Sequence, residues 1–216
     1  MKNEQIKLYL TKLRNEYEKE FQSISQKENI FKEVYADLKN FNFVDYKIRL
    51  EEEIKENLKE WWTNVEKGIV KEEELFAVLF EYGHYFAKGV QAESYGIGQW
   101  KEYEVKTEEF DMGFDYDFTT EFYAAPGLTL NFFDSLEKLD YSNLPANLQD
   151  DDIDEIAGYE ELINLHKISG MINIQEVLQK LDNEKEFEEL NYKNNFMFII
   201  DEHDSGEVYP LLIKNK

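Results

Sequence analysis

Aspartate and histidine side chains stand close together near the C-terminal end of the sequence. Asp201, His203 and Asp204 lie within four consecutive positions. A carboxylate beside an imidazole can hold a metal ion or transfer a proton, because histidine changes protonation near neutral pH. Together with His203 or His84 as the imidazole, such carboxylates are the candidates for a metal-dependent hydrolase. None of the histidines, His166 included, has the His-x-x-x-His spacing of a metal-binding helix, so structural or solvated roles are the simpler interpretation.

A run of acidic residues partly matches a calcium-binding loop. Asp150, Asp152, Asp154 and Glu161 stand at positions one, three, five and twelve of such a loop. Position six of the loop needs glycine for a sharp turn, and Glu155 stands there instead. Acidic residues are also common at the start of a helix, where they interact favourably with the helix dipole. A helix start explains this run without a metal, and no metal or cofactor is expected.

The remaining chemical motifs are incomplete or absent. The segment from Ala92 to Gly96 places Ser94 as in the nucleophile elbow of a hydrolase, but its first glycine is replaced and a loop is predicted where the elbow needs a helix. Gly96 and Gly98 lack the third glycine and the lysine of a phosphate-binding loop. The sequence has no cysteine, which excludes disulfides, thiolate nucleophiles and thiolate zinc sites. We therefore expect no enzymatic activity and no catalytic residue.

The strongest feature of the sequence is its negative charge. The 47 acidic and 24 basic residues give a formal net charge of −23. Between Thr107 and Glu161, 16 acidic residues accompany a single basic one, Lys138, whereas Met1 to Glu74 contain 17 acidic and 14 basic residues. Like charges this close repel one another, so such a field typically improves solubility or attracts a cationic partner. A basic protein partner is expected, with a solvated acidic face as the alternative. The expected partner-binding residues are Asp111, Asp115, Asp117, Asp150, Asp151, Asp152, Asp154, Glu155 and Trp100.

Charge and hydropathy also limit where the chain acts. An acidic protein is repelled by nucleic-acid backbones and anionic membranes, so neither is an expected partner. The longest apolar run, Leu75 to Phe80, is far shorter than the roughly 20 residues that a membrane span requires. The N-terminal segment is interrupted by charges and lacks the apolar stretch of a signal peptide. A soluble cytoplasmic protein is expected, and its oligomeric state stays open.

Apolar periodicity predicts three helices in the first third of the chain. Apolar residues three and four positions apart form one stripe from Ile6 to Ile24. Ser25 and Glu28 have the spacing of a capping box, which predicts the start of a second helix. The segment from Phe41 to Leu50 alternates like a strand and is interpreted as a connector to a third helix, which ends at Gly68.

The middle and the end of the chain have the apolar patterns of strands. Leu75–Tyr82 and Tyr85–Tyr95 are predicted as two strands of a sheet. From Phe110 to Phe118 apolar residues take every second position, which places them on one face of a strand. Two apolar segments on either side of residues 203–206 predict a C-terminal hairpin, and Pro210 places its second strand at a sheet edge or a bulge.

Three further helices are predicted between these strands. Asn131 to Leu139 forms a short helix, Asp152 to Ser169 a longer one that ends at Gly170, and Asn173 to Leu181 a last short one. Helices come first and most strands later, without an internal repeat or a low-complexity linker.

These patterns predict an α+β fold in which N-terminal helices pack with a mainly antiparallel sheet that includes a C-terminal β-hairpin. A single domain over residues 1–216 is expected. A helical N-terminal subregion over residues 1–68 is the alternative division.

The chain resembles the bacterial immunity proteins that are encoded beside polymorphic or contact-delivered toxins. Small size, acidity, the absence of cysteine, the α+β pattern and the lack of catalytic motifs carry this resemblance. From Leu75 to Ile213 the chain also resembles an uncharacterised bacterial domain family, with the segments VLQKLDNEKEF and NNFMFIIDEHD near its end. That second resemblance covers about two thirds of the chain and carries no functional residues. The first implies a protein that binds a cognate toxin and blocks its active site or substrate groove.

The expected function is therefore that of a non-enzymatic acidic binding protein that neutralises a basic toxin such as a nuclease. Two alternatives stay open. A carboxylate and histidine metal-dependent hydrolase would need at least three such groups around a pocket, and a scaffolding module would bind through exposed apolar surface.

Overall fold

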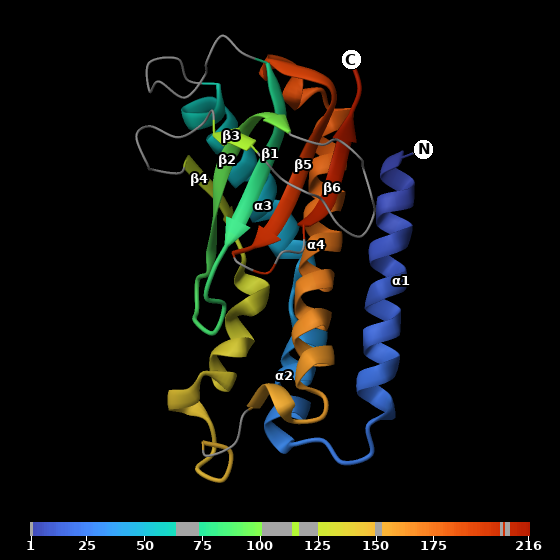
Figure 1. Cartoon of the computed structure of the whole chain (residues 1–216), viewed down its shortest axis with the longest axis vertical. Helices are drawn as coiled ribbons and strands as arrows, with labels where there is room; N and C mark the ends of the chain where they lie inside the picture. Colours follow the sequence, from blue (N-terminus) through green and yellow to red (C-terminus); the bar gives the residue numbers. More distant parts are fainter. Residues whose placement is uncertain are drawn as a thin grey trace.

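The computed structural model describes residues 2–63, 74–100, 114–116, 125–149, 153–203, 205 and 208–216. For residues 2, 99, 100 and 114–116 only the backbone is described. In this part of the chain, α-helices pack with a six-stranded sheet (Figure 1). The helices are α1 (Lys2–Ser23), α2 (Asn29–Asn40), α3 (Phe43–Asn57) and α4 (Tyr159–Asn183). The strands are β1 (Leu75–Tyr82), β2 (Gln91–Trp100), β3 (Phe114–Tyr116), β4 (Ala125–Thr129), β5 (Tyr192–Glu202) and β6 (Val208–Lys214).

The sheet is mixed, with mainly antiparallel pairs. Its order is β3-β2-β1-β5-β6, and β4 pairs with β2 outside this path. Only the central strands β1 and β5 pair in parallel; the other described pairs are antiparallel. In Figure 1, α4 runs behind the sheet and α1 lies beside the edge strand β6. The predicted α+β class, with N-terminal helices and a C-terminal hairpin of β5 and β6, is confirmed.

The apolar stripe predicted from Ile6 to Ile24 forms α1, which ends one residue before Ile24, at Ser23. The starts of the next two helices differ from the prediction. The expected capping box is wrong, because Glu28 is the N-cap of α2 and makes no side-chain cap hydrogen bond. The predicted connector is also wrong: α3 begins at Phe43, where the Asn42 side chain accepts a hydrogen bond from the Asp45 backbone N–H. Because this cap starts the helix at Phe43, the residues that alternate like a strand in the sequence lie in α3 instead.

A π-helical turn, η1 (Leu58–Trp62), follows α3 and orients its last side chain toward the sheet. Trp62 is 1% exposed, and its ring centroid lies 5.7 Å from that of Phe80 on β1. Phe80 stacks on Phe198 of β5 with 6.0 Å between ring centroids. These rings form the centre of the core between helices and sheet. The predicted helix end at Gly68 lies outside the described residues.

Strand predictions in the middle of the chain hold in part. β1 has the predicted bounds, but the strand expected over Tyr85–Tyr95 begins only at Gln91. Of the alternating segment Phe110–Phe118, the backbone of β3 is a strand and the rest lies outside the described residues. β4 contains Pro126 and Gly127 and was not predicted, because both residues are rare inside strands.

The C-terminal hairpin and the role of Pro210 are confirmed. β6 is the edge strand next to β5. Phe198 pairs with Leu212 whereas Ile199 pairs with Pro210, so Leu211 is the additional residue of a β-bulge. Pro210 therefore stands both on an edge strand and beside a bulge, the two places where a sheet tolerates proline.

The helix after the acidic run is longer than predicted. Residues 131–139 form the expected short helix, as the 3-10 helix η3, but α4 continues from Tyr159 to Asn183 without ending at Gly170. The two helices predicted over 152–169 and 173–181 are therefore wrong and form one element. Gly170 allows close packing here, since a Cβ atom on it would lie 2.1 Å from Cζ of Phe132 in η3.

Candidate functional site

Three carboxylates lie side by side across the centre of the sheet. Glu81 of β1 pairs with Glu93 of β2 on one side and with Asp201 of β5 on the other. Directly paired residues of neighbouring strands point to the same face of a sheet. Glu93, Glu81 and Asp201 therefore form one row at the C-terminal ends of β1 and β5.

The turn after β5 adds a histidine and a hydroxyl group to this row. His203 Nδ1 lies 3.0 Å from Glu81 Oε1, and its backbone N–H donates to the Tyr82 carbonyl oxygen at 2.9 Å. The Ser205 hydroxyl donates to Asp201 Oδ1 at 3.1 Å. We call Glu93, Glu81, Asp201 and His203 the carboxylate–histidine row.

The row is electrostatically unbalanced. Asp201 is 8% exposed, and burial raises its pKa to about 6; the charges of Glu81 and Glu202 act in the same direction, while the Ser205 hydrogen bond opposes them. Among the described residues, none of the three carboxylates forms an ion pair with lysine or arginine. Their partners are instead His203, Ser205 and the Tyr95 hydroxyl, which donates to Glu93 at 2.8 Å. The row therefore carries negative charge that no lysine or arginine among the described residues neutralises.

The raised pKa of Asp201 predicts a change of stability with pH. Asp201 binds its proton more tightly in the folded chain than in the unfolded chain. Its protonation therefore stabilises the fold fully below about pH 4, and this stabilisation is lost as pH rises through 6. We expect Asp201→Asn to remove about 1 kcal/mol of the difference in unfolding free energy between pH 5 and pH 7. Urea denaturation at both pH values measures this difference, with Asp154→Asn on an exposed site as the control. An Asp201→Asn profile parallel to that of the native chain would refute the assignment.

The three histidines lie at separate places in the fold and do not form one metal centre. His84 lies 3.9 Å from an Asp140 carboxylate oxygen, and His203 contacts Glu81. His166 is completely buried between the Ser135 hydroxyl and the Leu162 carbonyl oxygen, and burial lowers its pKa to about 4, so it is neutral at pH 7. No group of three or more potential metal ligands occurs within the ranges that the structure describes. Asp204 lies outside those ranges.

Ser94 has a structural role. It stands inside β2 and is completely buried. Its hydroxyl accepts from Trp62 Nε1 at 2.9 Å and donates to the Pro126 carbonyl oxygen at 2.8 Å. A buried hydroxyl in the interior of a strand does not have the exposed turn geometry of a nucleophile elbow.

The residues predicted to bind a partner are described only in part. Asp111, Asp117, Asp150, Asp151 and Asp152 lie outside the described residues. Asp115 and Trp100 lie in the paired strands β3 and β2, where only their backbone is described.

Asp154 and Glu155 are exposed in a short 3-10 helix, η5 (Ile153–Glu155). In Figure 1, β3 lies in the sheet half of the molecule, whereas η5 lies near the opposite end, before α4. The described backbone therefore does not bring these two acidic segments together.

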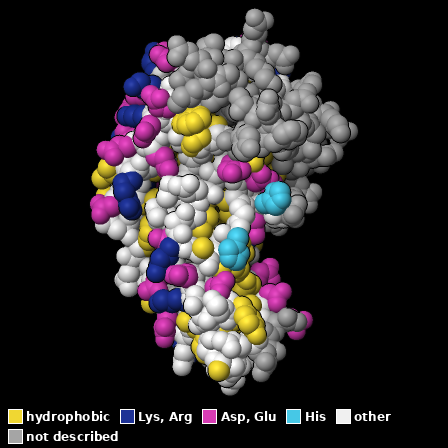
Figure 2. Space-filling model, turned by 90° about the vertical axis from the view of Figure 1, so that its left-hand side faces the viewer, with side chains coloured by type: hydrophobic (Ala, Val, Ile, Leu, Met, Phe, Trp, Pro, Cys, Tyr) yellow, Lys and Arg dark blue, Asp and Glu magenta, His cyan; other side chains and the backbone are white. Residues whose placement is uncertain are grey.

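The face seen from the β4 side has an uneven distribution of charge. Figure 2 shows histidine side chains beside aspartate and glutamate side chains along one side of this face. Lysine and arginine side chains gather along its other side. Aspartate and glutamate side chains are interleaved with these basic side chains, whereas no lysine or arginine is seen beside the histidines in this view.

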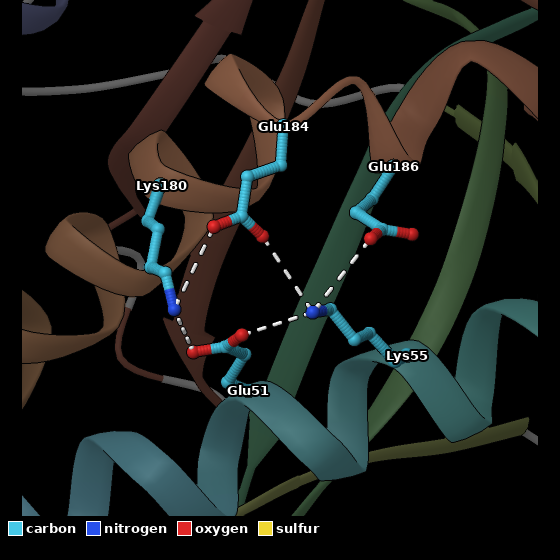
Figure 3. A network of polar contacts seen from close by, with 5 residues as sticks. All are labelled: Glu51, Lys55, Lys180, Glu184 and Glu186. Carbon is cyan, nitrogen blue, oxygen red and sulfur yellow. Dashed lines mark hydrogen bonds and ion pairs between the residues drawn. The ribbon is translucent and has the colours of Figure 1, made fainter.

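Acidic side chains between the helices are, in contrast, neutralised within the molecule. Glu51 and Lys55 of α3 face Lys180 of α4, and Glu184 and Glu186 complete the network (Figure 3). Lys55 Nζ lies 2.9 Å from Glu51, 3.5 Å from Glu184 and 3.6 Å from Glu186. Hydrogen bonds from Lys180 and then Lys55 lower the pKa of Glu51. This network joins α3 to α4 and leaves little net charge for a partner.

Sequence reasoning found half of the row. Asp201 and His203 are neighbours in the chain and were recognised, whereas Glu81 and Glu93 were not. Glutamate at the end of the apolar strand Leu75–Tyr82 was the available signal. The pairing of Glu81 with Asp201 depends on strand register, which is set by long-range packing and is absent from local sequence patterns.

No helix in the described part of the chain is long and apolar enough to span a membrane. Comparisons with protein-family models, curated proteins and solved structures yield no match to this chain.

Proposed function

We propose that this chain is a non-enzymatic, acidic binding protein that neutralises a basic toxin, such as a nuclease, by covering its active-site groove. The carboxylate–histidine row carries this proposal, because three carboxylates lie side by side on one face of the sheet without a lysine or arginine partner among the described residues. Cationic side chains of a partner would neutralise this row and would relieve the repulsion within it.

The charge of the surrounding sequence supports the same proposal. The segment from Thr107 to Glu161 contributes −15 of the formal net charge of −23. A field of this kind accelerates encounter with an oppositely charged protein, toward roughly 10⁸ to 10⁹ M⁻¹s⁻¹ at low salt. Fast association suits an inhibitor that must bind a toxin before the toxin reaches its target. The proposal includes that the protein comes from a bacterium and acts in the cytoplasm.

Charge reversal tests the proposal. The partner is captured from the native host and identified, and its association with the purified full chain is then measured by stopped flow at low and at physiological salt. We expect Glu93→Lys, Asp115→Lys and Asp152→Lys each to slow association several-fold, since each weakens the negative field that attracts a cationic partner. Glu20→Lys changes the charge equally at an exposed position of α1 and is the matched control.

Association that ignores salt and all three reversals would refute the electrostatic mechanism. Equal slowing by Glu20→Lys would show that net charge alone matters and would remove the row from the interface. A gene for a large secreted toxin beside the gene for this chain would support the identity of the partner.

An exposed apolar pair on α3 favours the scaffolding alternative. Val44 and Ile48 are 65% and 54% exposed and stand one helical turn apart. If they form the contact, Ile48→Glu will weaken partner binding more than Glu93→Lys does. The hydrolase alternative has no comparable support among the described residues.

A further inference from the structure

A groove of about 250 Å³ lies among four helices and is lined by residues of α1, the end of α2, the start of α3 and the middle of α4. Its polar lining consists of Arg14, Lys39, Ser169 and Asn173, and no carboxylate among the described residues lines it. We call it the cationic groove. It shares no residue with the carboxylate–histidine row.

The charges around the cationic groove do not cancel. Glu18 of α1, outside the lining, lies 3.3 Å from Arg14 Nη1 and 2.9 Å from Lys39 Nζ. The same carboxylate also accepts from the Tyr35 hydroxyl at 2.7 Å. One negative charge therefore faces two positive charges, and an excess of one positive charge remains. This excess stands out in a chain whose formal net charge is −23.

The polar lining also has hydrogen-bond donors that the fold does not use. Arg14 donates through Nε to the Ser169 hydroxyl oxygen at 3.2 Å, and its Nη1 faces Glu18. Its Nη2 group has no acceptor in the described part of the chain. Ser169 is 4% exposed, and its hydroxyl hydrogen likewise has no acceptor there.

Asn173 adds a further donor to the same lining. Its Nδ2 atom donates to the Ser169 carbonyl oxygen at 2.8 Å. A carboxamide nitrogen carries two hydrogens, so one N–H remains for a ligand. A group that only accepts hydrogen bonds and carries one negative charge matches these donors. A carboxylate is such a group, and its two oxygens suit the planar fork of a guanidinium.

The rest of the lining is apolar. Leu38 of α2 is buried, while Phe43 of α3 and Ile172 of α4 are half-buried. Hydrocarbon that contacts these side chains is removed from water, which favours binding in proportion to the apolar area. Drug-sized ligands occupy pockets of roughly 300 to 1,000 Å³, so the cationic groove suits a smaller molecule.

We propose that the cationic groove binds a small organic monoanion, a carboxylate with a short hydrocarbon chain. Arg14 and Lys39 hold the carboxylate, and the Ser169 hydroxyl donates to it. The hydrocarbon chain lies against Phe43 and Ile172. This binding site is independent of the proposed toxin-binding surface.

The test titrates sodium hexanoate into the methyl-labelled full chain at constant ionic strength. Nuclear magnetic resonance follows the methyl signals of Leu38 and Ile172, for which we expect a saturable shift. Arg14→Gln removes the guanidinium and its charge but keeps a polar side chain, so it should weaken binding by about fivefold or more. Arg49→Gln makes the same change at an exposed position of α3 outside the groove and should bind as the native chain does.

Lys39→Gln, at an exposed position, provides a second variant if Arg14→Gln does not fold, and it should also weaken binding. Signals that do not saturate, or equal binding by these two variants and the native chain, would overturn the proposal. Equal weakening by Arg49→Gln would likewise overturn it, because net charge and not the groove would then decide binding.

Two further compounds test the two halves of the ligand separately. Hexanamide keeps the hydrocarbon chain without the charge, and acetate keeps the charge without most of the chain. Both should bind more weakly than hexanoate. Equal binding of hexanamide would refute recognition of an anion, and equal binding of acetate would refute the contact with the apolar side chains.

Discussion

We expect Trp62→Ala to lower the free energy of unfolding by about 3 to 5 kcal/mol, the usual cost of removing a large buried aromatic side chain. The Trp62 ring contacts Phe80 and Phe198, the stacked rings at the centre of the core. Its Nε1–H group also donates to Ser94, so the substitution removes a buried hydrogen bond together with the packing. Urea denaturation followed by far-ultraviolet circular dichroism measures the loss without depending on tryptophan fluorescence.

Two further variants separate packing from hydrogen bonding at this position. Trp62→Phe keeps a ring but loses the donor, and should cost about 1 to 2 kcal/mol. Trp61→Ala removes the neighbouring, partly exposed tryptophan and should cost less than Trp62→Ala. A loss from Trp62→Ala below that from Trp61→Ala would show that the π-helical turn does not position Trp62 in the core.

Gly170→Ala is expected to destabilise the fold by about 2 to 3 kcal/mol, the upper range for overpacking a core. Helix propensity alone would predict the opposite sign, because alanine is favoured over glycine inside a helix by about 1 kcal/mol. The new Cβ atom would lie 2.1 Å from Cζ and 2.3 Å from Cε2 of the Phe132 ring, which must then move within a close-packed core. Thermal and urea denaturation measure whether Gly170→Ala lowers or raises the free energy of unfolding.

Gly83→Ala is the matched control for this substitution. No atom lies within 4 Å of the position of its Cβ atom, so little change of stability is expected. Gly170→Ala combined with Phe132→Leu should cost less than the sum of the two single changes, since leucine leaves room for the added methyl group. Additive costs, or a stabilised Gly170→Ala, would contradict close packing between α4 and η3.

The same glycine explains where sequence reasoning about the helices was wrong. Glycine after an apolar stripe usually marks a helix end, and that rule divided α4 at Gly170. The structure uses this residue for a long-range contact with Phe132, which no local pattern contains. By comparison, α1 and β1 were predicted well, because their apolar periodicity directly reflects the face or faces that they bury.

The candidate site was predictable only to the extent that its residues are close in sequence. Asp201 lies near the end of β5 and His203 follows in the next turn, and both were singled out, but Glu81, the partner of His203, comes from a strand far away in the chain. Their proximity results from the parallel pairing of β1 and β5. The acidic segment between Thr107 and Glu161 was evident from composition, yet composition contains no information about which of its carboxylates share a surface.

The parallel pairing of β1 and β5 also has a consequence for biosynthesis. Ala77 pairs with Met197, and more than half of the chain lies between them. The ribosome must therefore synthesise all the residues between Ala77 and Met197 before the two central strands can meet. Contacts this distant in sequence form slowly, because a large loop must close first. Until then, the apolar β1 segment lacks its β5 neighbour, and apolar surface exposed in this way favours aggregation of the unfinished chain.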